Sequence, residues 1–184
     1  MMMMMMIRVL CVVFIVFTTR IDAEECRSDV VEPGVIKFTR LYVTKEGLTA
    51  LQHCTVQRLV KKPLPGGETA QYVRNITSDI QPSGIVITQQ VGDNPWHQCP
   101  TSQFVVTIDG TWFVNTTNGD YVEMSRGHVL YQDDYKGLIM PNGVQPVHYS
   151  GVVGSEPCNQ MVISTASHLV SVDDTSCDWT RNFQ

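Results

Sequence analysis

The chain lacks the composition of several large protein classes. Charged residues make up only 17% of its 184 residues and hydrophobic residues 43%, which excludes both a charge-rich disordered tail and a multispan membrane protein. Its 13 Lys and Arg are outnumbered by 18 Asp and Glu, for a formal net charge of −5. Because a basic excess is absent, we expect no nucleic-acid partner.

Familiar chemical motifs are also scarce. The sequence has no closely spaced Cys-x-x-Cys pair of a zinc knuckle, no Gly-rich phosphate loop and no nucleophile elbow. The pairs Asp133-Asp134 and Asp173-Asp174 lack an EF-hand pattern, and we interpret them as solvated turns. No long window carries an apolar stripe at helical spacing, so helices are not expected.

The first 23 residues have the pattern of a secretory signal. Arg8 precedes the apolar run Val9–Phe17, which is too short to span a membrane. Ala23, with Ile21 two positions before it, predicts cleavage after Ala23. We therefore expect a signal peptide over 1–23, a single mature domain over 24–184 and a secreted, extracellular product without a stable membrane span. An uncleaved anchor is the alternative.

Cysteine usage agrees with export. Removing Cys11 with the signal from the six cysteines leaves five. In an oxidising compartment this number predicts two disulfides and one free thiol, although spacing does not give the pairing. We expect Cys26 and Cys177 to be engaged, since they lie near the chain ends. The disulfide candidates are Cys26, Cys54, Cys158 and Cys177.

Two acceptor sequons for N-glycosylation are present. They are Asn75-Ile-Thr77 and Asn115-Thr-Thr117. Both predict a glycan only if the chain passes through a eukaryotic secretory route.

The body of the chain has the pattern of an all-β domain. Short β-branched and aromatic runs alternate with turn signals such as Asp109-Gly110, Asn118-Gly119 and Asn142-Gly143. Further turns are expected at Pro63-x-Pro65-Gly66-Gly67 and Pro82-x-Gly84. Such a pattern predicts a sandwich or barrel. The expected strands are Val35–Val43, Thr49–Val60, Gln71–Ile76, Ile85–Val91, Gln103–Ile108, Thr111–Asn115, Tyr121–Met124, Val129–Gln132, Val144–Val153 and Gln160–Ser164.

Two segments in the middle of the chain carry a resemblance to a known family. Residues 96–110 (WHQCPTSQFVVTIDG) and 125–134 (SRGHVLYQDD) resemble small single-domain cupins, which have a "WH-x-x-P-x-x-Q-[FY]-V-V-x-[IL]-x-G" hairpin. The resemblance covers roughly 36–165 and implies a cupin-type double-stranded β-helix, a jelly-roll barrel. His128, where the group usually has aspartate, and the longer stretch 135–147 depart from the pattern.

The resemblance also implies where a site would lie. The first cupin motif, His-x-His followed by Glu and Gly, falls on His97, Cys99, Gln103 and Gly110, and the histidine of the second motif falls on His148. In metal-bearing cupins, three histidines and a carboxylate hold a divalent ion. The corresponding set here is His97, Cys99, Gln103 and His148, for one divalent metal such as Fe, Mn, Zn or Cu. The alternative is that the histidines contact an organic ligand, or pack in the barrel, without a metal.

We expect a secreted cupin-fold protein that binds a small molecule in its barrel, with a degenerate metal site. One alternative is a metal-dependent cupin enzyme of the oxygenase or isomerase type. Another is an extracellular structural or interaction protein, and a homodimer is left open. The expected ligand-binding residues are Trp96, His97, Gln103, Tyr131 and His148; no catalytic residue is named.

It stays open which face of the central strand, Gln103–Ile108, lines the interior. Phe104, Val106 and Ile108 form its more apolar face, opposite to Gln103. Both faces of a jelly-roll strand can be covered, so the pattern does not say which face lines the interior.

Overall fold

The computed structural model describes residues 32–67, 69–76, 80–166 and 177. The expected signal peptide 1–23, Cys26 and Asp173-Asp174 lie outside the described residues. The described part belongs to one compact unit, Glu32–Gln184. It contains strands and no helix, which confirms the all-β prediction. Accordingly, none of the described residues form a helix that could cross a membrane.

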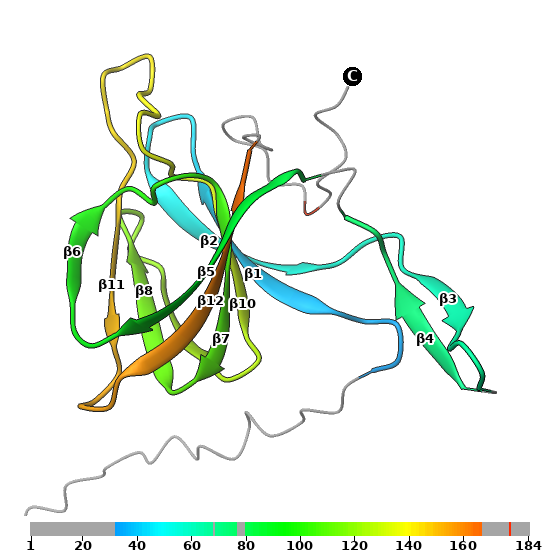
Figure 1. Cartoon of the computed structure of the whole chain (residues 1–184). Coiled ribbons are helices and arrows are strands. Elements are labelled where there is room, and N and C mark those ends of the chain that lie inside the picture. Colours follow the sequence, from blue (N-terminus) through cyan, green and yellow to red (C-terminus); the bar gives the residue numbers. More distant parts are fainter. Residues whose placement is uncertain (1–31, 68, 77–79, 167–176, 178–184) are drawn as a thin grey trace, which may run out of the picture. The chain divides into compact units, whose positions relative to one another are not determined.

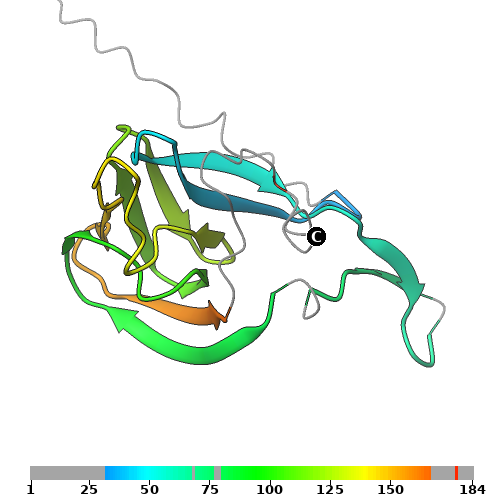
Figure 2. The ribbon, with the colours of Figure 1, turned by 90° about the horizontal axis from the view of Figure 1, so that it is seen from above.

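Two large sheets lie face to face (Figures 1 and 2). One has six strands in the order β2-β1-β10-β7-β12-β5, and the other has four in the order β6-β11-β8-β9. Only β1 and β10 pair in parallel; the other described pairs are antiparallel. The strands are β1 (Lys37–Val43), β2 (Thr49–Thr55), β3 (Val60–Pro63), β4 (Ala70–Val73), β5 (Pro82–Gln90), β6 (Asn94–His97), β7 (Gln103–Asp109), β8 (Thr111–Thr116), β9 (Tyr121–Ser125), β10 (Val129–Gln132), β11 (His148–Val152) and β12 (Cys158–Thr165).

The strand predictions fail mainly where the chain changes sheets. The expected run Thr49–Val60 ends at Thr55 and resumes only at Val60, because Arg58 between them has a positive φ of 59°. Val60 then starts the hairpin β3–β4, which forms a sheet of its own apart from the two large sheets (Figure 1).

Two further differences involve proline. The expected turn at Pro82-x-Gly84 is instead the start of β5, where Gly84 pairs with Ser164. Proline is tolerated there because β5 is an edge strand. Strand β6 was not predicted, since it has four residues, includes Pro95 and shows no alternation. The turn at Asn118-Gly119 is confirmed between β8 and β9, with Gly119 at a φ of 90°.

The main core lies between the two sheets. Strand β7 shows how it forms, because Val105 points into this core while Phe104 points to the opposite face. Gln103 lies two residues before Val105, so its side chain also faces the interior. The interior face of β7 is therefore the one that carries Gln103 and Val105. The buried members of the inter-sheet core are Leu41, Val105, Trp112, Val114, Met124, Leu130 and Cys158.

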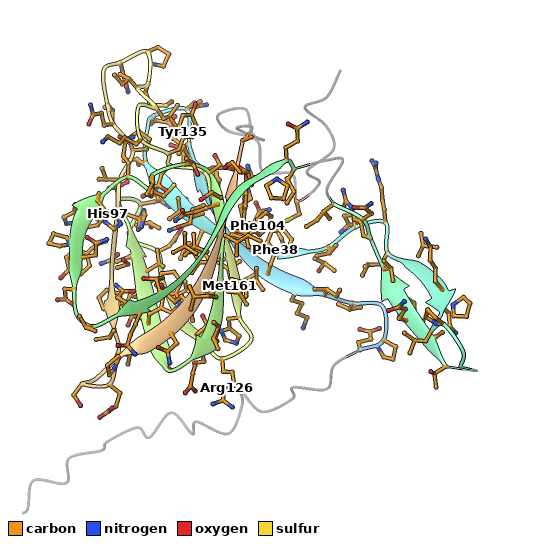
Figure 3. The ribbon with its side chains drawn as sticks, viewed as in Figure 1. Phe38, His97, Phe104, Arg126, Tyr135 and Met161 are labelled. Carbon is orange, nitrogen blue, oxygen red and sulfur yellow. A yellow bond between two sulfur atoms is a disulfide. The ribbon has the colours of Figure 1, made fainter. Side chains whose placement is uncertain are left out.

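A second cluster covers the outer face of the six-stranded sheet. Phe38 and Phe104 lie there together (Figure 3), with Cys54, Ile80 and Tyr131. Since β1, β2, β7 and β10 all contribute, this cluster gives the sheet a second apolar layer. Both faces of its central strands are therefore buried.

One disulfide packs against this second cluster. Cys54 is bonded to Cys177, across 123 residues of sequence, and Cys177 packs against the cluster. The predicted engagement of these two cysteines is confirmed. Cys158 is buried with a free thiol, so its prediction as a disulfide partner is wrong; its place in the inter-sheet core explains why. The described residues contain no second bridge.

We expect replacement of both Cys54 and Cys177 by alanine to lower the free energy of unfolding by about 4–5 kcal/mol, because the bridge constrains a long loop of the unfolded chain. Urea unfolding of the variant and of wild type measures this difference. Reduced wild type is the control and should unfold like the variant. Equal stability of oxidised and reduced wild type would contradict the prediction.

Candidate functional site

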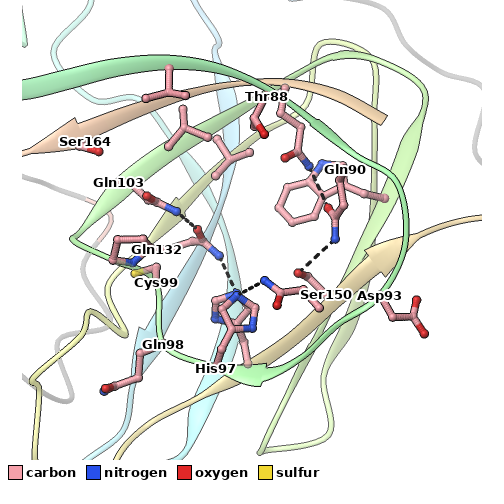
Figure 4. A pocket seen from close by; sticks show the side chains of 18 of the residues that line it. Thr88, Gln90, Asp93, His97, Gln98, Cys99, Gln103, Gln132, Ser150 and Ser164 are labelled. Carbon is pink, nitrogen blue, oxygen red and sulfur yellow. Dashed lines mark hydrogen bonds between the residues drawn. The ribbon is translucent and has the colours of Figure 1, made fainter. Parts of the chain in front are cut away.

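A cavity of about 760 Å³ opens between the two sheets, beside the edge strand β5. Alternate residues of two adjacent strands point into it, as the period of two in a strand requires. These are Val86, Thr88 and Gln90 from β5, and Gln160, Val162 and Ser164 from β12 (Figure 4). Gln103 and Val105 of β7, together with His148 and Ser150 of β11, continue the lining.

The lining is mixed apolar and polar, and almost uncharged. It includes one carboxamide from each of four strands of the six-stranded sheet: Gln90, Gln103, Gln132 and Gln160. Asp93 is the only Asp or Glu among the described lining residues, and no Lys or Arg is among them. Carboxamides both donate and accept hydrogen bonds. The cavity therefore offers paired donors and acceptors rather than a charge.

A chain of hydrogen bonds between lining residues of the cavity connects the two sheets (Figure 4). Gln103 Nε2 donates to Gln132 Oε1 at 2.8 Å, and Gln132 Nε2 lies 3.2 Å from His148 Nε2. His148 Nδ1 lies 2.5 Å from Asp134 Oδ2. Because Gln132 Oε1 accepts from Gln103, its Nε2 donates to His148 Nε2, and the proton of His148 is on Nδ1, which donates to Asp134. Each donor in the chain thus points toward Asp134.

His97 lies next to His148. Their ring centroids are 4.2 Å apart, because β6 pairs His97 directly with His148 of β11. His97 Nδ1 donates to the carbonyl oxygen of Pro95 at 2.8 Å, and its Nε2 accepts from Asn94 Nδ2, also at 2.8 Å. Burial and the neighbouring His148 lower the pKa of His97. His97 is therefore held neutral with a defined tautomer.

Cys99 lines the cavity as a thiol. Burial raises its pKa far above the usual value, and the nearby Asp134 carboxylate raises it further. Without a cation beside it, this thiol therefore keeps its proton. Its backbone is fixed by the same aspartate, since Cys99 N donates to Asp134 O at 3.1 Å.

These donors do not fit a divalent metal ion. The described residues contain no group of three or more His, Cys, Asp or Glu placed to hold one. Nε2 of both His97 and His148 already accepts a hydrogen bond. The structure brings His97, Cys99, Gln103 and His148 to one cavity, but their chemistry does not support the expected metal set.

Two of the expected ligand-binding aromatics lie elsewhere. Trp96 is 50% exposed and packs against Tyr149, with ring centroids 5.8 Å apart. Tyr131 belongs to the outer cluster and packs on Phe104 at 4.6 Å. It follows Leu130, which points into the inter-sheet core, so its own side chain points the other way. Trp112 does line the cavity, with its Nε1 donating to Thr107 Oγ1 at 2.9 Å.

The interpretation of Asp133-Asp134 as a solvated turn is wrong. Both are buried, and Asp134 has no exposed surface. Arg40 Nη2 lies 3.4 Å from Asp133 Oδ2, and burial raises the pKa of Asp133 to about 6 against the opposing effect of Arg40. The signal in the sequence was Arg40 itself, since an arginine inside an apolar strand needs a buried acid partner.

Comparison with known proteins gives structural likenesses only. No protein-family model matches the chain, and no curated protein matches it significantly. A protein from Neisseria meningitidis is similar over 45% of this chain and 72% of its own, with 13% identity and a TM-score of 0.33. A cupin-2 domain containing protein from Shewanella frigidimarina is similar over 44% of this chain and 68% of its own, with 17% identity and a TM-score of 0.33. The Cnp3 cupin domain of Schizosaccharomyces pombe is similar over 73% of this chain and 86% of its own, with 13% identity and a TM-score of 0.31.

Cupin structures are thus among those to which this chain is similar. Identities of 17% or less and TM-scores of 0.33 or less carry no information about a ligand or a reaction of this chain.

Removal of the Asp134 carboxylate should release His148. In Asp134→Ala the buried Nδ1–H loses its acceptor, and we expect a loss of about 1–3 kcal/mol in unfolding free energy. Two-dimensional ¹H–¹⁵N NMR should show His148 leaving the pure Nδ1–H tautomer. The exposed Glu123→Ala is the control and should change neither. An unchanged His148 spectrum would contradict the hydrogen-bond chain.

The lowered pKa of His97 predicts a pH dependence of stability. Below about pH 6.5 the unfolded chain takes up a proton at His97 more readily than the folded chain. Stability of wild type relative to His97→Gln should therefore fall as the pH drops from about 7.5 to 5. Denaturant titrations of both proteins across this range measure the difference. A flat or opposite slope would show that His97 is not held neutral.

Proposed function

We propose that this chain is an exported protein that binds a small uncharged polar molecule in the cavity between its sheets. The observation that carries the proposal is the lining of four strand carboxamides, Gln90, Gln103, Gln132 and Gln160, in an open cavity of about 760 Å³. That size lies in the usual range for small-ligand sites.

The scarcity of charge in the described lining selects the ligand class. A charged ligand would leave water for a cavity whose described lining offers Asp93 as its only Asp or Glu and no Lys or Arg, which is costly. Hydroxyl, carbonyl or amide groups could instead exchange water for carboxamide partners. Trp112, Val105 and Val162 add apolar surface beside them. Sugars, polyols and small amides therefore fit best.

Export is supported by two independent features. The Cys54–Cys177 disulfide needs an oxidising compartment to persist. The sequence pattern over 1–23, with a basic residue before a short apolar run, is that of a secretory signal. A metal-dependent enzyme is less well supported, because the donor set does not fit a metal.

An interaction protein is the second candidate, favoured by strand β5. This edge strand has nine residues, and Ile85 and Ile87 on its outer face are 66% and 64% exposed. A long apolar edge is a template for pairing with another chain. A homodimer joined through β5 would be one such use.

The cavity proposal is tested by blocking the cavity from the edge strand. Purified protein is screened by ligand-observed NMR against sugars, polyols and small amides, with matched acids and amines. We expect uncharged compounds to bind, and Thr88→Trp to weaken their binding at least about tenfold by filling the cavity. Ile87→Trp, on the opposite face of the same strand, is the matched control and should leave binding unchanged. Binding only of charged compounds, or equal binding by Thr88→Trp, would refute the proposal.

A further inference from the structure

Aromatic side chains cross the outer face of the four-stranded sheet. Each strand supplies one: Trp96 from β6, Tyr149 from β11, Phe113 from β8 and Tyr121 from β9. Their ring centroids follow each other at 5.8, 5.8 and 5.5 Å. Trp96 and Tyr121 are 50% and 54% exposed. This aromatic row lies outside the cavity and is used by neither core cluster.

Asn115 lies among three of these rings. The sheet register places it directly between Tyr149 on one neighbouring strand and Tyr121 on the other. Phe113 is two residues earlier on the same strand, so it shares the same face. Within the described part of the chain, the side chain of Asn115 makes no hydrogen bond. Asn115 is also the acceptor of the sequon Asn115-Thr116-Thr117.

The three rings are held in place. Tyr149 OH donates to Asp93 Oδ2 at 2.7 Å, and Tyr121 OH donates to Glu123 Oε1 at 3.1 Å. Phe113 lies over Gly151, where an added Cβ would come within 2.6 Å of its ring. The rings around Asn115 are therefore ordered before any partner arrives, which lowers the entropic cost of covering them.

We propose that Asn115 carries an N-linked glycan and that its first sugar packs on Phe113, Tyr121 and Tyr149. A sugar ring has a C–H face whose burial against aromatic rings is favourable. The covalent link favours this occupant over a free carbohydrate, because tethering raises the local concentration to about the millimolar range. The inference rests on the proposed export, through a eukaryotic secretory route, and not on the cavity.

The transfer is performed by the export machinery of the host. Asn115 Nδ2 loses a proton and forms a bond to the anomeric carbon of an oligosaccharide carried on a lipid diphosphate. The anomeric carbon–oxygen bond breaks, and the lipid diphosphate leaves with that oxygen. This chain supplies the acceptor amide and the surface on which the product settles.

The experiment compares glycoforms of the chain secreted by a eukaryotic host. All forms carry Asn75→Gln, so that one sequon remains. Mass spectrometry of the peptide around Asn115 should show high occupancy. The full glycan and a form trimmed to its first sugar should melt about 2–4 °C above Asn115→Gln, a shift that corresponds to about 1 kcal/mol for a domain of this size. Amidase removal of the glycan from the folded protein gives a second unglycosylated form, should Asn115→Gln not be secreted.

Variants of the aromatic rings distinguish packing of the first sugar on these rings from attachment of the glycan alone. In the Tyr121→Thr, Tyr149→Thr double variant, the melting difference between trimmed and unglycosylated forms should fall by at least half. Trp96→Thr changes a ring of the same row on β6, which does not adjoin Asn115, and should preserve the difference. A secreted protein with an unmodified Asn115, equal melting of all forms, or an unchanged difference in the double variant would overturn the inference. Retention of an unglycosylated chain in the cell would overturn export as well, while none of these results bears on ligand binding in the cavity.

Discussion

The chain of hydrogen bonds that ends on Asp134 is the interaction on which the site depends. It starts on Gln103 of β7, passes through Gln132 of β10 and reaches His148 of β11, so it joins the two sheets through side chains. All its donors point the same way, and reversing one of them would set two donors or two acceptors against each other. Asp134 Oδ1 is buried without a hydrogen-bond partner within the described residues, so the order of the chain comes from Oδ2 alone. The order of donors fixes the side-chain geometry at the end of the cavity nearest His97.

Much of the fold could be predicted from the sequence, because strand and turn signals are local. The run Val129–Gln132 is a strand with the predicted bounds, and Asn118-Gly119 forms the expected turn. The sequence placed His97 and His148 at one site only through the cupin resemblance, since they are 51 positions apart and no local pattern connects them; their direct pairing was not predicted. The outer location of Tyr131 was missed, because both faces of β10 are covered and period-two alternation alone does not identify the interior.

The remaining parts of the site depend on long-range packing. Gln90 and Gln160 meet across β5 and β12, with Gln160 Nε2 donating to Gln90 Oε1 at 3.3 Å. Nothing in the sequence near either glutamine indicates a cavity. Asp134 was missed for a related reason, since an aspartate after a strand is usually solvated and only the position of His148 makes it an internal acceptor.

Alternation within strands gives this small domain several unlike surfaces. On β8, Trp112 and Val114 point into the core, while Phe113, a member of the aromatic row, and Asn115 point to the opposite face. After β10 the same alternation separates two adjacent acids: Asp133 pairs with Arg40, and Asp134 binds His148.

The two aspartates therefore cannot exchange roles. Asp133 points to the same face as Tyr131 and pairs with the buried Arg40. Asp134 points to the same face as Gln132 and holds His148 in the cavity. A one-residue slip of this segment would leave either Arg40 or His148 without an aspartate, depending on its direction, and an uncompensated buried Arg40 would cost several kcal/mol. The register of β10 is thus fixed by charge as well as by apolar packing, and the polarity of the cavity follows from it.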